Sequence, residues 1–211
     1  MAILNLRKNR AMSSWAKIPA FKNATWLNTP PACSADATGV LQATSGDRTD
    51  FWRITHYGFI RDDGHALLTP SPGDFTATLT FQGDYEQLYD QAGLMVRAGP
   101  ENWVKFGVEY TDGVPHLSSV VTHGVSDWSA RPAPQAMTNP ITIRITRLGD
   151  CLLLQSLADD GTWQMERLAP WPDDIADTMA GPYLCSPERD GFVARFIDFR
   201  LGEPLVDQLH G

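Results

Sequence analysis

Residues 75–81 read FTATLTF, and this stretch decides the fold class. Its apolar side chains alternate with threonines, which is the period-2 pattern of a strand with one buried face. Further strands are expected over residues 92–97, 103–110, 116–122, 141–146, 151–157, 163–168 and 192–201. Turn signals such as Asp112-Gly113 separate these strands, so neighbours run antiparallel. Because no helical segments alternate with them, the chain is predicted to be all-β, a sandwich or a barrel.

Proline-rich stretches leave little room for helix. They lie at 30–31, 70–72, 132–140 and 170–172. Only residues 172–179 could form a short helix, because two aspartates there suit a first turn. Residues 1–20 lack the pattern of the rest and are expected to be an N-terminal arm. Without an internal composition shift, residues 21–211 are predicted to form one domain.

Composition narrows the class of partner. The chain has 211 residues, a formal net charge of -8 and only 17 Lys and Arg, so we expect neither nucleic acid nor an anionic membrane surface as a partner. Its three cysteines show no CxxC spacing, which predicts neither a disulfide framework nor a thiolate zinc site. With no signal-peptide pattern at the N-terminus, the protein is expected in the cytoplasm, a reducing compartment.

Strand 103–110 has two faces of different kind. Its apolar face alternates with a face that carries Lys105, Gly107 and Glu109. Lys105 and Glu109 are about 13 Å apart along a strand, at about 3.4 Å per residue, so they cannot pair with each other. Gly107 leaves room for a ligand or a neighbouring aromatic side chain. This face either lines a ligand groove or is an ordinary solvated face with cross-strand ion pairs.

Two further clusters contain candidate site residues. Trp52, His56 and His65 can line a sugar site or act as acid and base, although histidines beside aromatics are often simply hydrogen-bonded. Asp127 and Trp128 lie on a predicted loop, where a ring can stack on a sugar while the carboxylate accepts from hydroxyls. The alternative is a capped turn with the tryptophan in the core. No HxH or HExxH spacing is present, so we predict no metal site.

Glycoside hydrolysis is disfavoured by the sequence. The reaction needs two carboxylates about 5–9 Å apart. Strand 103–110 provides no second acid on the face of Glu109, and no ExDxE or GxSxG pattern occurs. The sequence leaves open whether another strand provides the second carboxylate.

Several short motifs occur in a characteristic order. They are DFW at 50–52, THYG at 55–58, GH at 64–65, YDQAGLM at 89–95, WVKFGVE at 103–109, SSVVT at 118–122, SDWS at 126–129 and GPYLCSP at 181–187. In these motifs, and over nearly all of the chain from Trp26 onward, the sequence resembles the uncharacterised domain family that includes the yeast regulation-of-enolase protein. The resemblance implies a concanavalin-like jelly-roll sandwich of two antiparallel sheets, but no settled activity.

One sheet of a jelly roll usually presents a concave face on which residues of several strands converge. The residues expected to converge there are Trp52, His56, His65, Gln91, Lys105, Glu109, Asp127 and Trp128. They suggest a binding module for a saccharide or similar polyhydroxylated small molecule, with no cofactor. The alternatives are a metal-independent lyase or isomerase that uses His56 or His65 with Tyr57, Lys105 or Glu109, and a regulatory domain that binds a protein partner.

Overall fold

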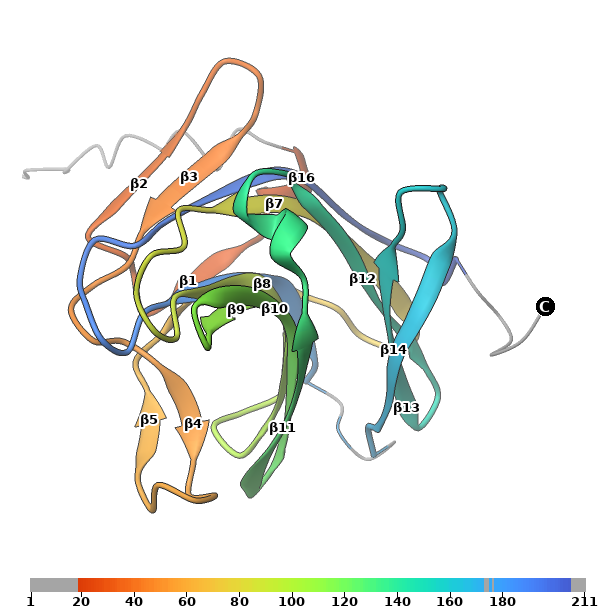
Figure 1. Ribbon diagram of the computed structural model, residues 1–211. Coiled ribbons are helices and arrows are strands. Elements are labelled where there is room, and N and C mark those ends of the chain that lie inside the picture. The colour runs from red at the N-terminus through yellow and green to blue at the C-terminus, as the bar shows by residue number, and fades with distance from the viewer. Residues whose placement is uncertain (1–18, 173–174, 176, 206–211) are drawn as a thin grey trace, which may run out of the picture.

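Two seven-stranded sheets pack face to face in the computed structural model, which describes residues 19–172, 175 and 177–205 (Figure 1). The first sheet has the order β1 (Thr25–Leu27), β6 (His65–Pro70), β15 (Met179–Cys185), β8 (Gln91–Arg97), β9 (Asn102–Thr111), β10 (Val114–His123) and β11 (Val125–Pro132). The second has the order β14 (Trp163–Pro170), β13 (Cys151–Leu157), β12 (Ile141–Leu148), β7 (Phe75–Gly83), β16 (Val193–Gly202), β3 (Leu41–Thr44) and β2 (Ala32–Ala35). A separate hairpin consists of β4 (Phe51–Arg53) and β5 (Ile60–Asp62).

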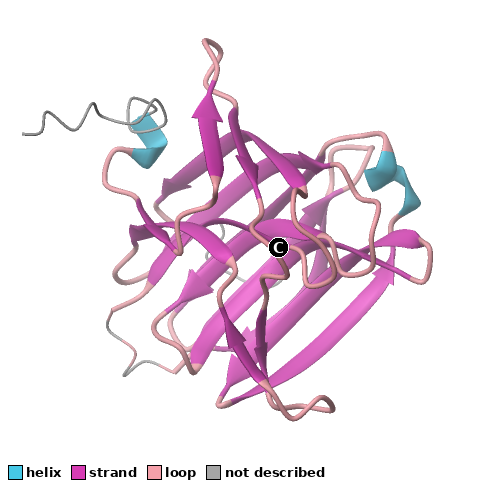
Figure 2. Cartoon of the chain, turned by 90° about the vertical axis from the view of Figure 1, so that its left-hand side faces the viewer, coloured by secondary structure: helices cyan, strands magenta, loops and turns pink. Residues whose placement is uncertain are grey.

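The all-β sandwich of two antiparallel sheets is confirmed. Strands pair antiparallel throughout the described part of both sheets. Figure 2 shows strands as almost the whole regular structure, apart from short 3-10 helices at Pro19–Phe21 and Pro134–Met137. The turn at Asp112-Gly113 has positive φ at both residues, as a tight two-residue hairpin loop requires, and it joins β9 to β10.

β7 shows why the alternating pattern produces this fold. Its apolar residues Phe75, Ala77, Leu79 and Phe81 are at most 3 % exposed and belong to the core between the sheets. The intervening threonines lie on the opposite face, where Thr76 and Thr80 each share a hydroxyl hydrogen bond of 2.9 Å with a threonine of β12. Each face of the strand therefore has its own set of partners, which fixes the register.

Strands β1–β6 and β15 are not among the strands that the sequence predicts, and two segments differ from what it does predict. Residues 126–129 were expected in a loop but belong to β11, an edge strand whose side chains are mostly exposed. The possible helix at 172–179 falls partly outside the described residues, and its last residue, Met179, begins β15 instead. Of the expected N-terminal arm, residues 1–18 lie outside the described residues. Over the ranges that are described, no helix is long and apolar enough to cross a bilayer.

The first sheet is covered on both faces. Its inner face, with Val104, Phe106 and Val108 of β9, packs into the main core. Its outer face is covered by the β4–β5 hairpin, which Figure 1 shows on the side remote from β7 and β16. A second apolar cluster fills this contact: Phe51, Trp52, Ala66, Leu68, Met95, Trp103, Val120, Tyr183 and Cys185. The hairpin is thereby held against the face that carries Lys105 and Glu109.

The three cysteines are free thiols, and their surroundings predict low reactivity. Burial raises the pKa of Cys33 to about 11 and also raises the pKa values of Cys151 and Cys185. Because the thiolate is the reactive species, we expect the native protein at about pH 8 to react with a chromogenic disulfide reagent far more slowly than free cysteine does. Denaturation without reductant should release three thiols. A reproducible count of one would show that a disulfide had formed.

Candidate functional site

A pocket of about 210 Å³ lies between the outer face of the first sheet and the loop of the β4–β5 hairpin. It is lined by Asp50, Trp52, Tyr57, Phe59, Tyr89, Gln91, Lys105, Glu109, Trp128, Pro187 and Glu188. Five of the eight expected site residues thus meet in one cavity: Trp52, Gln91, Lys105, Glu109 and Trp128. They come from β4, β8, β9 and β11, so the sheet order brings them together.

Lys105 forms part of the pocket floor and is fully engaged there. It is 3 % exposed, and its ammonium group donates to Gln91 Oε1 at 2.7 Å, to the Phe51 carbonyl at 2.9 Å and to Asp50 Oδ1 at 3.5 Å. Burial lowers the pKa of Lys105, but the negative charges of Asp50 and Glu109 outweigh it and leave the pKa raised. Lys105 is therefore a buried cation with all three N–H groups in use, and it does not lie on a solvated face.

Glu109 is also buried, yet part of its carboxylate is free. It is 6 % exposed, and its Oε2 accepts a hydrogen bond of 2.7 Å from the Ser118 hydroxyl, which in turn accepts one of 2.9 Å from the Trp128 indole N–H. Burial raises the pKa of Glu109, while Lys105 lowers it in part. A carboxylate has about four acceptor sites. The Ser118 hydroxyl occupies one of them and the Trp128 indole N–H at most one more, so acceptor capacity remains on Glu109, which lines the pocket.

Aromatic rings form the walls of the pocket. Tyr57 packs edge-on against Trp52 at 5.7 Å between ring centroids and stacks on Phe59 at 5.4 Å. Its hydroxyl lies 2.9 Å from that of Tyr89, which joins the hairpin loop to the far side of the pocket. Trp128 and Tyr57 are 41 % and 47 % exposed, so part of each side chain is open to a ligand.

The backbone around the pocket mouth is strained. Ile54, His56 and Tyr89 all have positive φ, at 65°, 62° and 64°. For a β-branched residue such as Ile54 this conformation is rare, and such strain occurs mainly where surrounding contacts impose it. Here the Ile54 amide donates to the Phe59 carbonyl at 2.7 Å, and the Gly58 amide donates to the Ile54 carbonyl at 2.6 Å. These bonds hold the loop in its tight shape.

Asp90 holds the opposite wall. It is fully buried and accepts from the Ser186 hydroxyl at 2.6 Å and from the Arg189 guanidinium at 2.6 Å. It also caps two backbone amides of the segment 86–87 at 2.9 Å. Tyr89 directly precedes Asp90 in the chain. Residues 187–188 lie between Ser186 and Arg189, the two residues whose side chains donate to Asp90. Asp90 therefore positions three lining residues without lining the pocket itself.

Three expected site residues lie outside the pocket lining. His65 is 5 % exposed, and its two ring nitrogens contact the backbone of Asn28 and Gly46; burial lowers its pKa. Its ring is thus committed to holding chain segments together. Asp127 forms an ion pair with Arg167 at 2.6 Å. His56 is exposed on the hairpin loop, with its ring against Tyr57.

Some lining residues were not among the expected ones. Asp50 and Tyr89 stand in the motifs of the resemblance, and so does Pro187, so a signal for them existed. Phe59 and Glu188 lie outside those motifs. Within the described part of the chain, no three His, Cys, Asp or Glu side chains gather in a way that could hold a metal ion.

The chain is similar to two fungal proteins. It is 40 % identical over 195 residues to Regulation of enolase protein 1 of Saccharomyces cerevisiae, which covers 92 % of this chain and 97 % of that protein. It is 32 % identical over 122 residues to an uncharacterized protein of Emericella nidulans, covering 54 % of this chain and 60 % of the other.

Solved structures agree with the fold. A functionally unknown protein from Saccharomyces cerevisiae matches with a TM-score of 0.81 at 41 % identity, covering 88 % of this chain and 99 % of that one. A xylan beta-1,4-xylosidase from Bacillus halodurans matches with a TM-score of 0.63 at 17 % identity, covering 87 % of this chain and 38 % of the xylosidase. The second likeness concerns the fold alone.

A family model matches most of the chain. The match extends over residues 26–204, which include every strand of both sheets except Thr25, the first residue of β1. The chain therefore belongs to the family described as "Protein of unknown function (DUF1349)".

Proposed function

We propose that the pocket binds a saccharide or a similar polyhydroxylated small molecule. The observation that carries the proposal is the combination of aromatic walls with the buried, partly unengaged carboxylate of Glu109. Aromatic rings pack on the apolar C–H faces of a sugar, while a carboxylate accepts hydrogen bonds from its hydroxyls. The volume of about 210 Å³ is below the ~300–1,000 Å³ of pockets for drug-sized ligands, which favours a ligand of about one sugar unit.

The similarity to known proteins supports this proposal. The fold resembles β-sandwiches of glycoside hydrolases such as the Bacillus xylosidase, and a relative of nearly equal length is named as a regulator. A binding module without turnover is compatible with both. We also propose a cytoplasmic location, because three free thiols suit a reducing compartment.

The test is a thermal-shift screen of neutral, acidic and amino monosaccharides. A ligand at 100 times its Kd stabilises a protein by about 2.7 kcal/mol, which such a screen detects. Trp128→Ala should weaken binding of a hit by about tenfold, or ~1.4 kcal/mol, through loss of the stacking surface. A screen without hits would contradict the proposal.

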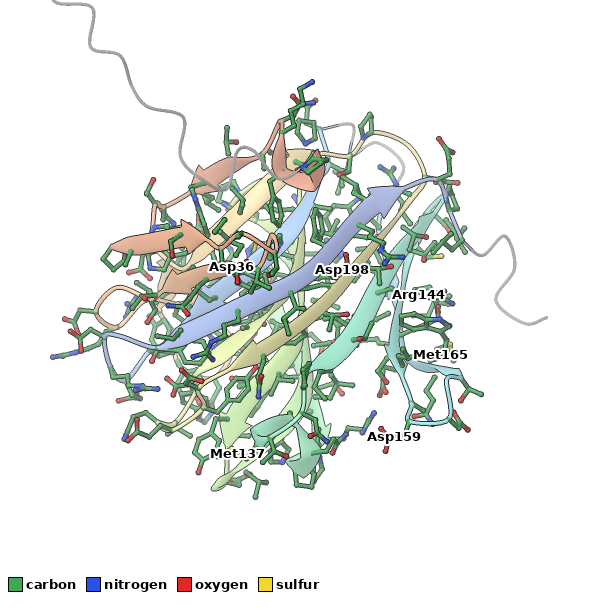
Figure 3. All side chains as sticks on the ribbon, turned by 90° about the horizontal axis from the view of Figure 1, so that it is seen from above. Asp36, Met137, Arg144, Asp159, Met165 and Asp198 are labelled. Atoms are coloured by element: carbon green, nitrogen blue, oxygen red, sulfur yellow. The ribbon has the colours of Figure 1, made fainter. Side chains whose placement is uncertain are left out.

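Trp163→Ala is the matched control. Trp163 lies on β14 of the second sheet, where the Arg144 guanidinium lies 4.1 Å from the centroid of its ring; Figure 3 labels Arg144 on this sheet. Its replacement should leave ligand affinity unchanged. If instead a hit binds Trp128→Ala as tightly as the unmodified protein, the site lies elsewhere.

One observation favours a second candidate function, metal-independent catalysis of proton transfer. Asp50 and Glu109 come from different elements and line the same pocket, so the second acid that strand 103–110 lacks is provided by the start of the hairpin. Two carboxylates in different environments can divide acid and base roles. Product formed from a hit, detected by chromatography and abolished in both Asp50→Asn and Glu109→Gln, would establish an enzyme.

A regulatory protein partner is the third candidate, in keeping with the name of the yeast relative. The hairpin exposes Ile54, Tyr57, Phe59 and Ile60 by 41–53 %, and an exposed apolar patch favours a protein contact. Loss of saccharide affinity in Trp128→Ala would favour saccharide binding, because Trp128 lies on β11 and is not part of this exposed patch of the hairpin.

A further inference from the structure

The charges of the pocket do not balance. Its lining contains three carboxylates, of Asp50, Glu109 and Glu188, and a single cation, Lys105. The Lys105 ammonium group and the Asp50 carboxylate form an ion pair with an N–O distance of 3.5 Å. The other two N–H groups of Lys105 donate to Gln91 and to a backbone carbonyl. The carboxylates of Glu109, on the pocket floor, and of Glu188, on the exposed rim, remain. Neither has an ion-pair partner among the described residues.

The same pocket offers no free cationic donor for an acidic ligand. Lys105 is the one basic residue in its lining, and a phosphate or carboxylate would have to displace a donor from partners that are themselves buried. Leaving a buried polar group unpaired is costly. An anionic ligand would also face Glu109 and Glu188, so the pocket discriminates against sugar acids and sugar phosphates.

The aromatic lining adds to this preference. Five rings surround the cavity, those of Trp52, Tyr57, Phe59, Tyr89 and Trp128. The faces of aromatic rings carry negative electrostatic potential and attract cations, and cages of such rings recognise quaternary ammonium groups. A neutral sugar can use the rings for stacking, but it leaves the carboxylates of Glu109 and Glu188 without an ion-pair partner.

We infer that the ligand is a polyhydroxylated amine, with an ammonium group that lies among these rings and pairs with Glu109. This inference rests on the proposed function and specifies its substrate class. The buried carboxylate of Glu109 lines the cavity and has acceptor capacity left for the ammonium group, whereas the exposed Glu188 contributes mainly long-range attraction. Hydroxyls of the ligand then use the remaining acceptors and the ring faces.

The experiment compares matched sugars by isothermal titration calorimetry: glucose, N-acetylglucosamine, glucosamine and glucuronic acid. Glucosamine should bind about tenfold or more tightly than its two neutral counterparts, because only its amine is charged. Its affinity should fall at alkaline pH, where the amine loses its proton, while that of glucose does not. Glucuronic acid should not bind measurably.

Glu109→Gln tests the role of the buried carboxylate. The amide has nearly the same shape and can still accept from Ser118. Because burial raises the pKa of Glu109, its ionised form at neutral pH costs stability in the folded state, so this variant should fold at least as well as the unmodified protein. Glucosamine affinity should drop to the level of glucose. Glu203→Gln, an exposed position outside the pocket, is the control and should change nothing.

The outcomes separate this inference from the proposed function. Equal or tighter binding of glucose or glucuronic acid would overturn the ammonium assignment and leave saccharide binding intact. Binding of tetramethylammonium, lost in Glu109→Gln, with no response to any sugar would retain the cation site and overturn the saccharide proposal. No response to any of these probes would contradict both.

Discussion

Replacing Lys105 with methionine should lower the free energy of unfolding by about 3–5 kcal/mol, because it leaves a buried charge without its partner. Methionine keeps much of the side-chain volume, so the loss reports on charge rather than on a cavity. Without the ammonium group, the Asp50 carboxylate at 8 % exposure has no counter-charge, and Gln91 Oε1 loses its 2.7 Å donor. Urea denaturation followed by tryptophan fluorescence measures the change.

A double variant and a control support this interpretation. Adding Asp50→Asn to Lys105→Met removes both charges, so the double variant should recover part of the lost stability. This non-additivity is the signature of a direct interaction. Lys22→Met, at an exposed position, should stay within about 0.5 kcal/mol of the unmodified protein. A loss below about 1 kcal/mol in Lys105→Met would instead mean that Lys105 is a solvated surface charge.

The sequence alone predicts that Lys105 and Glu109 lie on the same face of strand 103–110. It does not predict which residues they contact. Alternation along residues 103–110 assigns the faces, because successive side chains of a strand point in opposite directions. The partner of Lys105 is 55 residues away in a hairpin that folds over the sheet. Short-range patterns carry no information about such a contact. The sequence therefore identified two floor residues of the pocket and missed the ion pair.

β15 and β11 escaped prediction for different reasons. β15 lies between β6 and β8 and is buried on both faces, so it shows no alternation, and Pro182 argues against a central strand. The structure accommodates the proline where pairing with β6 is interrupted, between Ala180 and Tyr183. β11 is an edge strand with mostly polar, exposed side chains, which resembles a loop in sequence.

The histidines show the limit of reasoning from residue type. His65 is next to a turn and near aromatic residues, which suited a sugar or acid–base site. In the structure its ring is held by the Asn28 carbonyl at 2.7 Å and by the Gly46 amide at 2.9 Å. Backbone groups can bond any polar side chain, so the sequence gives no sign of this contact. Tyr89, which was not among the expected site residues, does line the pocket, whereas His65 does not; Tyr89 is next to the buried Asp90 in the chain.

Substitution of Gly107 should have a second large effect on stability. The sequence suggested that Gly107 leaves room for a ligand or an aromatic side chain, but the structure gives it a different role. A Cβ atom at this position would lie 2.1 Å from the Ala92 carbonyl oxygen and 2.6 Å from the Gly93 Cα. The group that approaches Gly107 closely is thus the backbone of β8, rather than a ligand or an aromatic ring. Gly93 shows the reciprocal contact, 2.2 Å from the Phe106 carbonyl oxygen.

Gly107→Ala should therefore destabilise the protein by about 3 kcal/mol or more, at or above the upper end of what overpacking usually costs. Both obstructing atoms are backbone atoms of a paired strand, so relief requires that β8 and β9 separate and lose hydrogen bonds beneath the pocket. Gly202→Ala on β16 is the matched control, since nothing lies within 4 Å of its Cβ position, and it should change stability by about 0.5 kcal/mol or less. Urea denaturation of both variants measures the difference. If they prove equally stable, the strands can move apart freely at Gly107, and the floor of the pocket is not the rigid surface on which ligand recognition by Glu109 depends.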